Sequence, residues 1–477
     1  MRVALVYPRV KDRDLTQPLG LATVATYVRE YGGFNDIKIF DNNFDDIHTV
    51  IDYKPDIIGI TAMTIDYNRA KELAAYFKQK SDAHILIGGV HISTLPTSLA
   101  KCFDLGIVGE GEQTFLEVLQ FFEAKGGFEK GIGKIKGLVL RENRKIKITK
   151  TRELIEPLDK IPIIDRDFLN IEYFKKKMIP HMGRHGIEGS ILTARGCPYR
   201  CVFCSTAAFW KRVRFHSAER VYSEIKMLIE KYGADHITIW DDLFTANISR
   251  LKELAEFIRK DDVTNGITIS CQARANQIND SLCGVLKNLN VKQVGFGFES
   301  GSERILNFLK RGTVTLEQNK NAIITCKKHG IRVYGSLIFG SPGEKIEDMK
   351  KTIDFIRFAK KHGADAIWIF VMTPFPATDI WDIAKERKKV SDDMNWDKLS
   401  HQNIEDAMLL DPDIDKEEFK KTFLLAREEL NYFRIKYIKE NIRNNLLETL
   451  KTAVTNPHDT METVLGVLSK NRRSFQR

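Results

Sequence analysis

Short apolar runs alternate with amphipathic stretches over the first 130 residues or so. Five runs rich in Val, Ile and Leu predict strands at 2–8, 37–41, 56–62, 84–89 and 105–111. Between them, apolar residues recur at helical spacing at 20–32, 68–80 and 111–126. This alternation predicts an α/β fold with a doubly wound, Rossmann-like parallel sheet, and ligands bind such sheets beyond the carboxyl ends of the strands. We therefore expect the binding residues of this part in its strand-to-helix loops.

A second alternation of the same kind runs from residue 186 to about 390. Its apolar runs predict strands at 189–197, 236–242, 267–274, 292–300, 332–344 and 366–376. Six strand–helix units are too few for an eight-fold barrel and predict a partial (β/α)6 barrel of TIM type, whose active face lies at the strand carboxyl ends. The expected organisation is therefore a first domain at 1–130, a linker at 131–185 that contains a hairpin, the barrel at 186–390, and a helical region at 391–477.

Composition narrows the class of protein. A chain of 477 residues predicts two or three domains. It has no apolar run of the ~18 residues that a membrane span needs, and its first residues lack the features of a signal peptide, so we expect a cytoplasmic protein. The net charge of +10 favours anionic partners, but the basic residues are spread along the chain and no recognised motif supports nucleic acid as a partner.

Three of the seven cysteines lie close together in a loop after a predicted strand, namely Cys197, Cys201 and Cys204. Thiolates bind both zinc and iron–sulfur clusters, but structural zinc sites have four protein ligands. Neither the next cysteine, Cys271, nor the nearest histidine, His216, stands at zinc-finger spacing. A cubane cluster held by three cysteines would leave one iron open to a substrate or cofactor, which is a catalytic feature.

The spacing Cys-x-x-x-Cys-x-aromatic-Cys, with Phe203 as the aromatic residue, resembles the signature of radical S-adenosylmethionine (SAM) enzymes. The resemblance implies a [4Fe-4S] cluster on the three cysteines, with SAM at the open iron. It also implies SAM contacts from residues that follow the second, fourth and fifth barrel strands, which are Asp241, Asp242, Glu299, Gly340 and Gly343. Carboxylates suit an ammonium and ribose hydroxyls, and glycines let backbone approach an adenine ring. The alternatives are that Asp241 caps a helix and that Glu299 makes a surface ion pair.

Four stretches of the first domain, PLGLATVATYVREYG, GITAMT, ILIGGVHIS and VGEGE, resemble the cobalamin-binding domain that precedes the barrel in one large subgroup of these enzymes. The resemblance implies cobalamin as a cofactor, with candidate contacts from Thr61, Thr64, Gly88, Gly89 and His91. For His91, a loop histidine bonded to a neighbouring carbonyl is an open alternative. The loop after the first strand lacks Asp-x-His-x-x-Gly, so we expect no histidine–cobalt bond from it.

The resemblance implies an enzyme that methylates an unactivated carbon. In such chemistry a 5′-deoxyadenosyl radical abstracts hydrogen and methylcobalamin supplies the methyl group. A radical cyclisation, rearrangement or oxidation, as in the anaerobic magnesium-protoporphyrin monomethyl ester cyclase, is an alternative, and a non-catalytic corrin- or zinc-binding regulatory module is another. The expected partners are a small-molecule or peptide substrate of unknown identity and a reductant such as flavodoxin or ferredoxin.

Overall fold

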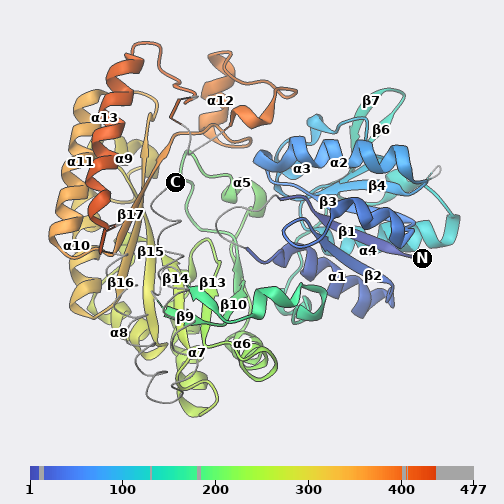
Figure 1. The fold of residues 1–477 in the computed structure, drawn as a ribbon, viewed down its shortest axis with the longest axis horizontal. Helices are drawn as coiled ribbons and strands as arrows, with labels where there is room; N and C mark the ends of the chain where they lie inside the picture. The colour runs from blue at the N-terminus through green and yellow to red at the C-terminus, as the bar shows by residue number, and fades with distance from the viewer. Residues whose placement is uncertain are drawn as a thin grey trace, which may run out of the picture.

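The computed structural model describes residues 1–436 apart from 10–15, 129–130, 180–183, 400–403, 406 and 434. Its described part contains two main sheets, each flanked by helices and joined by a connector, and further helices follow the second sheet (Figure 1). The last part of the expected C-terminal helical region, 437–477, lies outside the described residues. No helix in the described ranges is both long and apolar enough to cross a membrane.

The first sheet begins with five parallel strands in the order β2-β1-β3-β4-β5. They are β1 (Val3–Tyr7), β2 (Ile37–Asp41), β3 (Ile57–Thr61), β4 (His84–Gly88) and β5 (Leu105–Ile107). Alternate residues of β1 enter different apolar clusters, Val3 and Leu5 with α1 (Leu19–Gly32) and α4 (Gly111–Lys125), and Ala4 and Val6 with α2 (Tyr67–Lys80). Helices thus cover both faces, which confirms the doubly wound sheet.

The expected hairpin forms but belongs to the first sheet. Strands β6 (Leu138–Glu142) and β7 (Lys145–Ile148) pair antiparallel with each other, and β6 pairs antiparallel with β5. The sheet therefore has seven strands and extends past residue 130, where we had expected the linker to begin. The edge strand β5 offers unpaired backbone groups, and pairing with the hairpin satisfies them.

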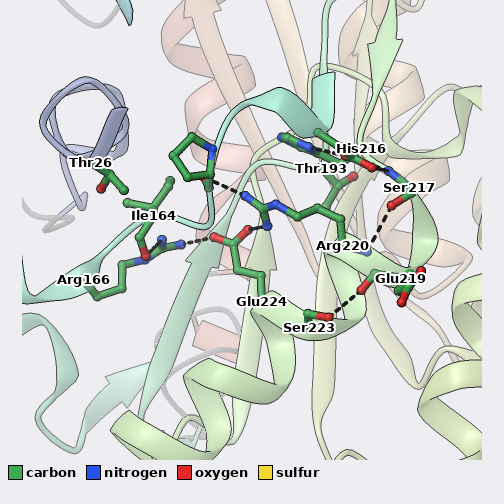
Figure 2. A network of polar contacts seen from close by, with 12 residues as sticks. Thr26, Ile164, Arg166, Thr193, His216, Ser217, Glu219, Arg220, Ser223 and Glu224 are labelled. Atoms are coloured by element: carbon green, nitrogen blue, oxygen red, sulfur yellow. Dashed lines mark hydrogen bonds and ion pairs between the residues drawn. The ribbon is translucent and has the colours of Figure 1, made fainter. Parts of the chain in front are cut away.

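The rest of the connector is fixed by a buried ion network, shown in Figure 2. Arg166, whose side chain is fully buried, donates to Glu224 Oε1 at 2.7 Å and to the carbonyl of Ser190 at 2.8 Å. Glu224 lies on α6 (Ala218–Tyr232), and its other oxygen accepts from Arg220 at 2.6 Å. Burial would raise the pKa of Glu224, but the two guanidinium groups bring that pKa below its ordinary value. The connector is therefore joined by charge to the first strand and first helix of the second sheet.

The second sheet has six parallel strands that follow chain order, which confirms the partial barrel. The strands are β10 (Glu188–Ile191), β13 (His236–Ile239), β14 (Thr268–Ala273), β15 (Val291–Glu299), β16 (Arg332–Phe339) and β17 (Ala366–Val371). Their outer layer contains α6, α7 (Ile248–Lys260), α8 (Asp280–Asn288), α9 (Glu303–Lys310), α10 (Leu316–Lys328) and α11 (Ile346–Lys361). After the last strand the described residues form α12 (Asp379–Glu386) and α13 (Lys416–Glu429), and α13 packs against α11.

The smaller elements lie around the strand-to-helix loops and in the connector. They are α3 (Val90–Thr94), α5 (Thr206–Trp210), β8 (Lys177–Ile179), β9 (Arg184–Gly186), β11 (Ala194–Arg195) and β12 (Arg214–Phe215). Strands β8 and β9 form one antiparallel ladder and β11 and β12 another. The β11–β12 ladder closes the segment that carries the cysteine cluster.

Candidate functional site

The three clustered cysteines lie in the loop between β11 and α5, beyond the end of β10. The chain enters this loop at Gly196, whose φ of +95° is in the left-handed region. A Cβ at Gly196 would stand 2.7 Å from the carbonyl oxygen of Arg212, so a side chain is excluded by both conformation and space. The thiols of Cys197, Cys201 and Cys204 are all free and half-buried. They can therefore be reached by a ligand that is not part of the chain.

Burial, together with the smaller effects of nearby Asp242 and the other two cysteines, raises the pKa of the Cys197 thiol to about 11. Burial also raises the pKa of Cys204. Thiolates at this position thus need a compensating positive charge, which a bound metal cluster supplies. Among the described residues, no three Cys, His, Asp or Glu side chains converge on one point, as the ligands of a single ion do. In a cubane cluster each thiolate binds a different iron, and no such convergence is required.

Backbone and side-chain hydrogen bonds fix the cysteine loop to the barrel. The amide of Val202 donates to the carbonyl of Leu309 at 3.1 Å, at the end of α9. Arg311 donates through Nε to the carbonyl of Arg200 at 2.6 Å. Arg274, directly after β14, donates through Nη1 to the sulfur of Cys201 at 3.3 Å. Strand ends and helix ends of the barrel thus determine where the thiols point.

The two adjacent aspartates after β13 have different surroundings. Asp241 is buried and accepts hydrogen bonds from the backbone amides of Thr193 at 2.6 Å and Ala194 at 3.0 Å, and also from the Thr193 hydroxyl. Burial raises its pKa to about 6. Asp242 is exposed and accepts from the hydroxyl of Thr206, at the start of α5, at 3.0 Å. The geometry favours a structural role for Asp241, which holds the backbone that enters the cysteine loop, and leaves Asp242 accessible to a ligand.

Glu299 ends β15 in an irregular conformation. Its φ is +63°, and the pairing of β15 with β16 shifts register between Gly297 and Glu299. The buried carboxylate accepts from Lys310 Nζ at 2.7 Å, and this ammonium lies 5.6 Å from the centre of the Phe203 ring. A left-handed conformation at a residue other than glycine is uncommon and marks functional sites. Glu299 therefore pairs with a buried lysine rather than on the surface, and Phe203 lies over that pair.

The loop after β16 contains both predicted glycines in left-handed conformations, with φ of +84° at Gly340 and +75° at Gly343. The carboxylate of Glu344 folds back under the loop and accepts from the amides of Gly340 at 2.6 Å and Ser341 at 3.1 Å. Burial raises the pKa of Glu344 to about 8. The loop is thus held from inside by the carboxyl group of Glu344, while at its tip the Gly343 amide donates to Asp411 and the Gly343 carbonyl accepts from Arg304 at 2.7 Å.

The five candidate cobalamin contacts fall into two groups. Gly88 ends β4, and a Cβ there would meet no atom within 4 Å, while Thr61 ends β3 beside it in register. Gly89 has a φ of +96°, and a Cβ there would stand 2.7 Å from the Thr61 hydroxyl. Thr64 and His91, by contrast, are buried. Thr61, Gly88 and Gly89 therefore lie at the carboxyl ends of β3 and β4.

His91 has neighbours on all sides. Its ring stacks on Tyr67 with centroids 3.9 Å apart, and its two nitrogens lie 3.3 Å from the Thr64 hydroxyl and 3.0 Å from the Ser98 hydroxyl. Burial lowers its pKa to about 3, so the ring is neutral. This geometry favours a histidine bonded within the protein, as in the alternative interpretation, but its partners are two hydroxyls and not the expected carbonyl. We do not include its side chain in the corrin site.

Sequence reasoning missed a buried charge cluster that joins the two sheets, which we call the clamp: Glu110, Glu112, Arg195 and Arg214. Arg195 lies two residues before the first clustered cysteine and donates to Glu110 and to Glu112, each at 2.5 Å. Arg214 donates to both oxygens of Glu110, each at 3.0 Å. The clamp glutamates come from the VGEGE stretch after β5, and all four side chains are at most 12% exposed. The loop after β5 is thus fixed directly to the cysteine loop.

The sequence does show the two glutamates of VGEGE and the arginine before the first cysteine. Their opposite charges predict an ion pair only if the two loops are known to face each other.

The inner face of the second sheet carries exposed aromatic side chains. Side chains alternate along a strand, and Ile237 and Ile239 of β13 enter the core beneath the helices. Trp240, which follows β13, is 46% exposed, and its indole N–H donates to Ser190 Oγ at 3.2 Å. Trp368 of β17 is 49% exposed. Two large aromatic rings therefore stand half exposed on this sheet, one near each edge, and the Trp368 ring packs against Tyr334 with centroids 5.3 Å apart.

Comparison with known proteins gives the family. Residues 10–119 match the B12 binding domain and residues 191–356 match the radical SAM superfamily. An uncharacterised methyltransferase of Pyrococcus horikoshii is 36% identical over 84% of this chain and 86% of its own length. The chain belongs to the B12-binding radical SAM family. This confirms the resemblance drawn from the cysteine spacing and from the glycine-rich loops of the first sheet.

A further relative and a solved structure are also similar to this chain. The anaerobic magnesium-protoporphyrin IX monomethyl ester cyclase of Rubrivivax gelatinosus is 26% identical over 82% of this chain and 71% of its own length. The fold is similar to that of TsrM from Kitasatospora setae, a radical SAM methyltransferase solved with cobalamin and a [4Fe-4S] cluster bound. The TM-score is 0.68 at 21% identity, over 82% of this chain and 76% of TsrM. The fold of the described residues is therefore that of a known B12-binding radical SAM enzyme.

Proposed function

We propose that this protein is a cobalamin-dependent radical SAM methyltransferase that methylates an unactivated carbon. The observation that carries the proposal is the clamp. Glu110 and Glu112, which follow β5 of the first sheet, form ion pairs with Arg195, and Arg195 lies two residues from Cys197. The corrin-binding loops and the cysteine loop are thereby held at one junction. In this proposal residues 1–130 bind the corrin, and residues 186–390 bind SAM and carry out its chemistry.

Both implied cofactors fit the residues at this junction. A planar ring system needs backbone without side chains, and the open space over Gly88 meets that need. A cluster needs accessible sulfur, and the three clustered thiols are half-buried and free. When bound, the cluster and SAM supply a 5′-deoxyadenosyl radical and the corrin supplies a methyl group.

In this proposal the chain's own residues bind and position these groups. Cys197, Cys201 and Cys204 hold the cluster. Asp242 is the carboxylate left accessible for the SAM ammonium, and the adenine lies against the turn at Gly340 and Gly343. Glu299 acts through its pair with Lys310 rather than as a free carboxylate. The exposed rings of Trp240 and Trp368 give the substrate an apolar surface, and a small redox protein such as a flavodoxin or ferredoxin supplies the electron.

Metal analysis of protein reconstituted without oxygen in the presence of a corrinoid tests this proposal. We expect about four irons and one cobalt per chain, as a cubane cluster and one corrin require. In the presence of SAM and a reductant, the protein should release 5′-deoxyadenosine. Cys201→Ala should lose both the iron and this product, whereas Cys102→Ala, a half-buried cysteine outside the loop, should retain both. Zinc in place of iron, or product formation by Cys201→Ala, would contradict the proposal.

The similarity to the magnesium-protoporphyrin ester cyclase supports radical cyclisation or oxidation as a second candidate. Methyl transfer consumes one SAM as methyl donor and leaves S-adenosylhomocysteine, whereas cyclisation leaves none. Once a substrate is known, S-adenosylhomocysteine formed in step with product supports methylation. Product with 5′-deoxyadenosine alone supports the second candidate.

A further inference from the structure

Arg274 is a buried arginine at the edge of the cysteine loop. It follows β14 directly, and only 8% of its surface is exposed. One terminal nitrogen, Nη1, lies 3.3 Å from the sulfur of Cys201, and the other, Nη2, donates to the hydroxyl of Thr313 at 2.5 Å. The planar guanidinium stacks on the ring of Tyr199, with Cζ 3.8 Å from the ring centre. Its position is therefore determined on three sides.

The surroundings of Tyr199 make this position rigid. Tyr199 lies between the first and second cysteines of the cluster, and its hydroxyl accepts from Asn276 Nδ2 at 3.3 Å. Asn276 also donates to the carbonyl of Thr313 at 3.1 Å. The cysteine loop, the turn after β14 and the turn after α9 are thus joined through one arginine and one asparagine. A guanidinium held in this way loses little freedom when it donates to sulfur.

The charge of Arg274 has no carboxylate partner. In the part of the chain that the structure describes, no Asp or Glu forms an ion pair with Arg274, and its Nε is buried without a hydrogen-bond partner. Buried arginines are normally paired, because an isolated charge in the protein interior is costly. The sulfur of Cys201 is the group this cation faces, and as a thiolate it carries the opposite charge. The pairing thus points to a ligand atom of the cluster.

We propose that Arg274 is a positioning residue that raises the reduction potential of the iron–sulfur cluster by donating a hydrogen bond to the Cys201 sulfur. The inference rests on the proposed function, in which Cys201 is a cluster ligand. Hydrogen bonds to cysteine sulfur and nearby charge are among the factors that set cluster potentials. A reduced cluster carries one more negative charge than the oxidised cluster, so a fixed cation and donor favour the reduced form. Arg274 thereby makes the one-electron reduction of the cluster easier.

The midpoint potential of the reconstituted cluster tests this inference. We expect Arg274→Gln to lower the equilibrium constant for reduction about tenfold, which for a one-electron couple is a shift of about 59 mV to more negative potential. The measurement is a redox titration followed by electron paramagnetic resonance of the reduced cluster, without SAM or corrinoid. Arg274→Lys retains the charge but loses the planar fork, so it should shift the potential in the same direction by less.

Arg311→Gln is the matched control. Arg311 also bonds the cysteine loop, but to the carbonyl of Arg200, and it pairs with Asp379 at half exposure. Its loss should leave the potential unchanged, even if it lowers iron content. A residue with only a structural role would change cluster loading and leave the potential of the loaded fraction as it was.

The outcomes separate the two proposals. A wild-type potential in Arg274→Gln overturns the inference and leaves the cluster assignment intact. If Arg274→Gln does not assemble a cluster, Arg274→Lys decides in its place, and a potential equal to that of the wild type overturns the inference. A wild-type chain that forms no cubane cluster at all instead overturns the proposed function.

Discussion

Replacing Arg195 by methionine tests the clamp directly. Methionine keeps an unbranched side chain that resembles the aliphatic stem of arginine but removes the charge, and Glu112 loses its ion-pair partner while Glu110 keeps Arg214. The two glutamates and two arginines balance before the change, and one negative charge is in excess after it. Breaking a buried ion pair by removing one partner costs about 3–5 kcal/mol. We expect Arg195→Met to lower the free energy of unfolding by that amount.

Urea denaturation of the metal-free protein at neutral pH measures this change. The control is Arg212→Met in the same hairpin, because Arg212 pairs with Glu156 at the surface with both side chains more than half exposed. Exposed pairs contribute about 0–1 kcal/mol, so the control should lose little stability. Since Cys197 lies two residues from Arg195, the clamp variant should also bind less iron than the control.

A double-mutant cycle identifies the cause of the loss. Arg195→Met combined with Glu112→Leu removes both charges of one pair and leaves Glu110 with Arg214. The double variant should lose less stability than the sum of the two single variants, by about 1–3 kcal/mol. Losses that add to within ~0.5 kcal/mol would refute the view that the clamp acts as one charge-balanced unit.

The clamp also predicts sensitivity to acid. Burial would raise the pKa of Glu110, but Arg195, Arg214 and the amide of Ile155 bring it below its ordinary value. A carboxyl group with a depressed pKa in the folded state stabilises the protein above its unfolded pKa, and this contribution is lost as the pH falls through the folded value. Arg195→Met should therefore weaken the decline in stability that the wild type shows on acidification below about pH 4.5.

Three further predictions concern the residues around the cofactor loops. Burial raises the pKa of Asp241 to about 6, so its protonated form stabilises the folded protein, and this contribution should be lost as the pH rises from about 4 to 6. Asp241→Asn should remove this pH dependence from the free energy of unfolding, measured with urea across that range. Gly89→Ala should cost about 1–3 kcal/mol of folding stability, because its φ is positive and the new Cβ would meet Thr61. Gly88→Ala should fold normally and bind corrinoid more weakly in equilibrium dialysis, and equal binding by this variant would contradict our placement of the corrin.

The pattern of apolar residues predicted nearly every strand of both sheets. Strands of parallel sheets are short and buried, so their sequences carry a strong local signal. The hairpin at β6 and β7 was found as a local element, but its attachment to the first sheet was not, because pairing with β5 depends on a contact between segments far apart in sequence. Local pattern identifies an element and says little about which edge it joins.

The candidate site divides in the same way. The spacing of the clustered cysteines was sufficient to predict the cluster loop, since ligand chemistry fixes that spacing within a few residues. The neighbouring Asp241 and Asp242 were indistinguishable in sequence, and only the structure separates the buried one from the exposed one. For His91 the sequence left two interpretations open, and the stacked Tyr67 ring decides which the geometry favours.

The sequence by itself determined the two α/β units, the cysteine loop and the family resemblance, because each depends on residues that are close together along the chain. The tertiary structure decided which charges meet. Arg195 reaches the loop after β5 because the carboxyl ends of the two sheets face each other. Arg274 reaches the sulfur of Cys201 because the loops that follow successive barrel strands lie side by side. A buried charge is stable only beside its partner, and that partner is chosen by the fold.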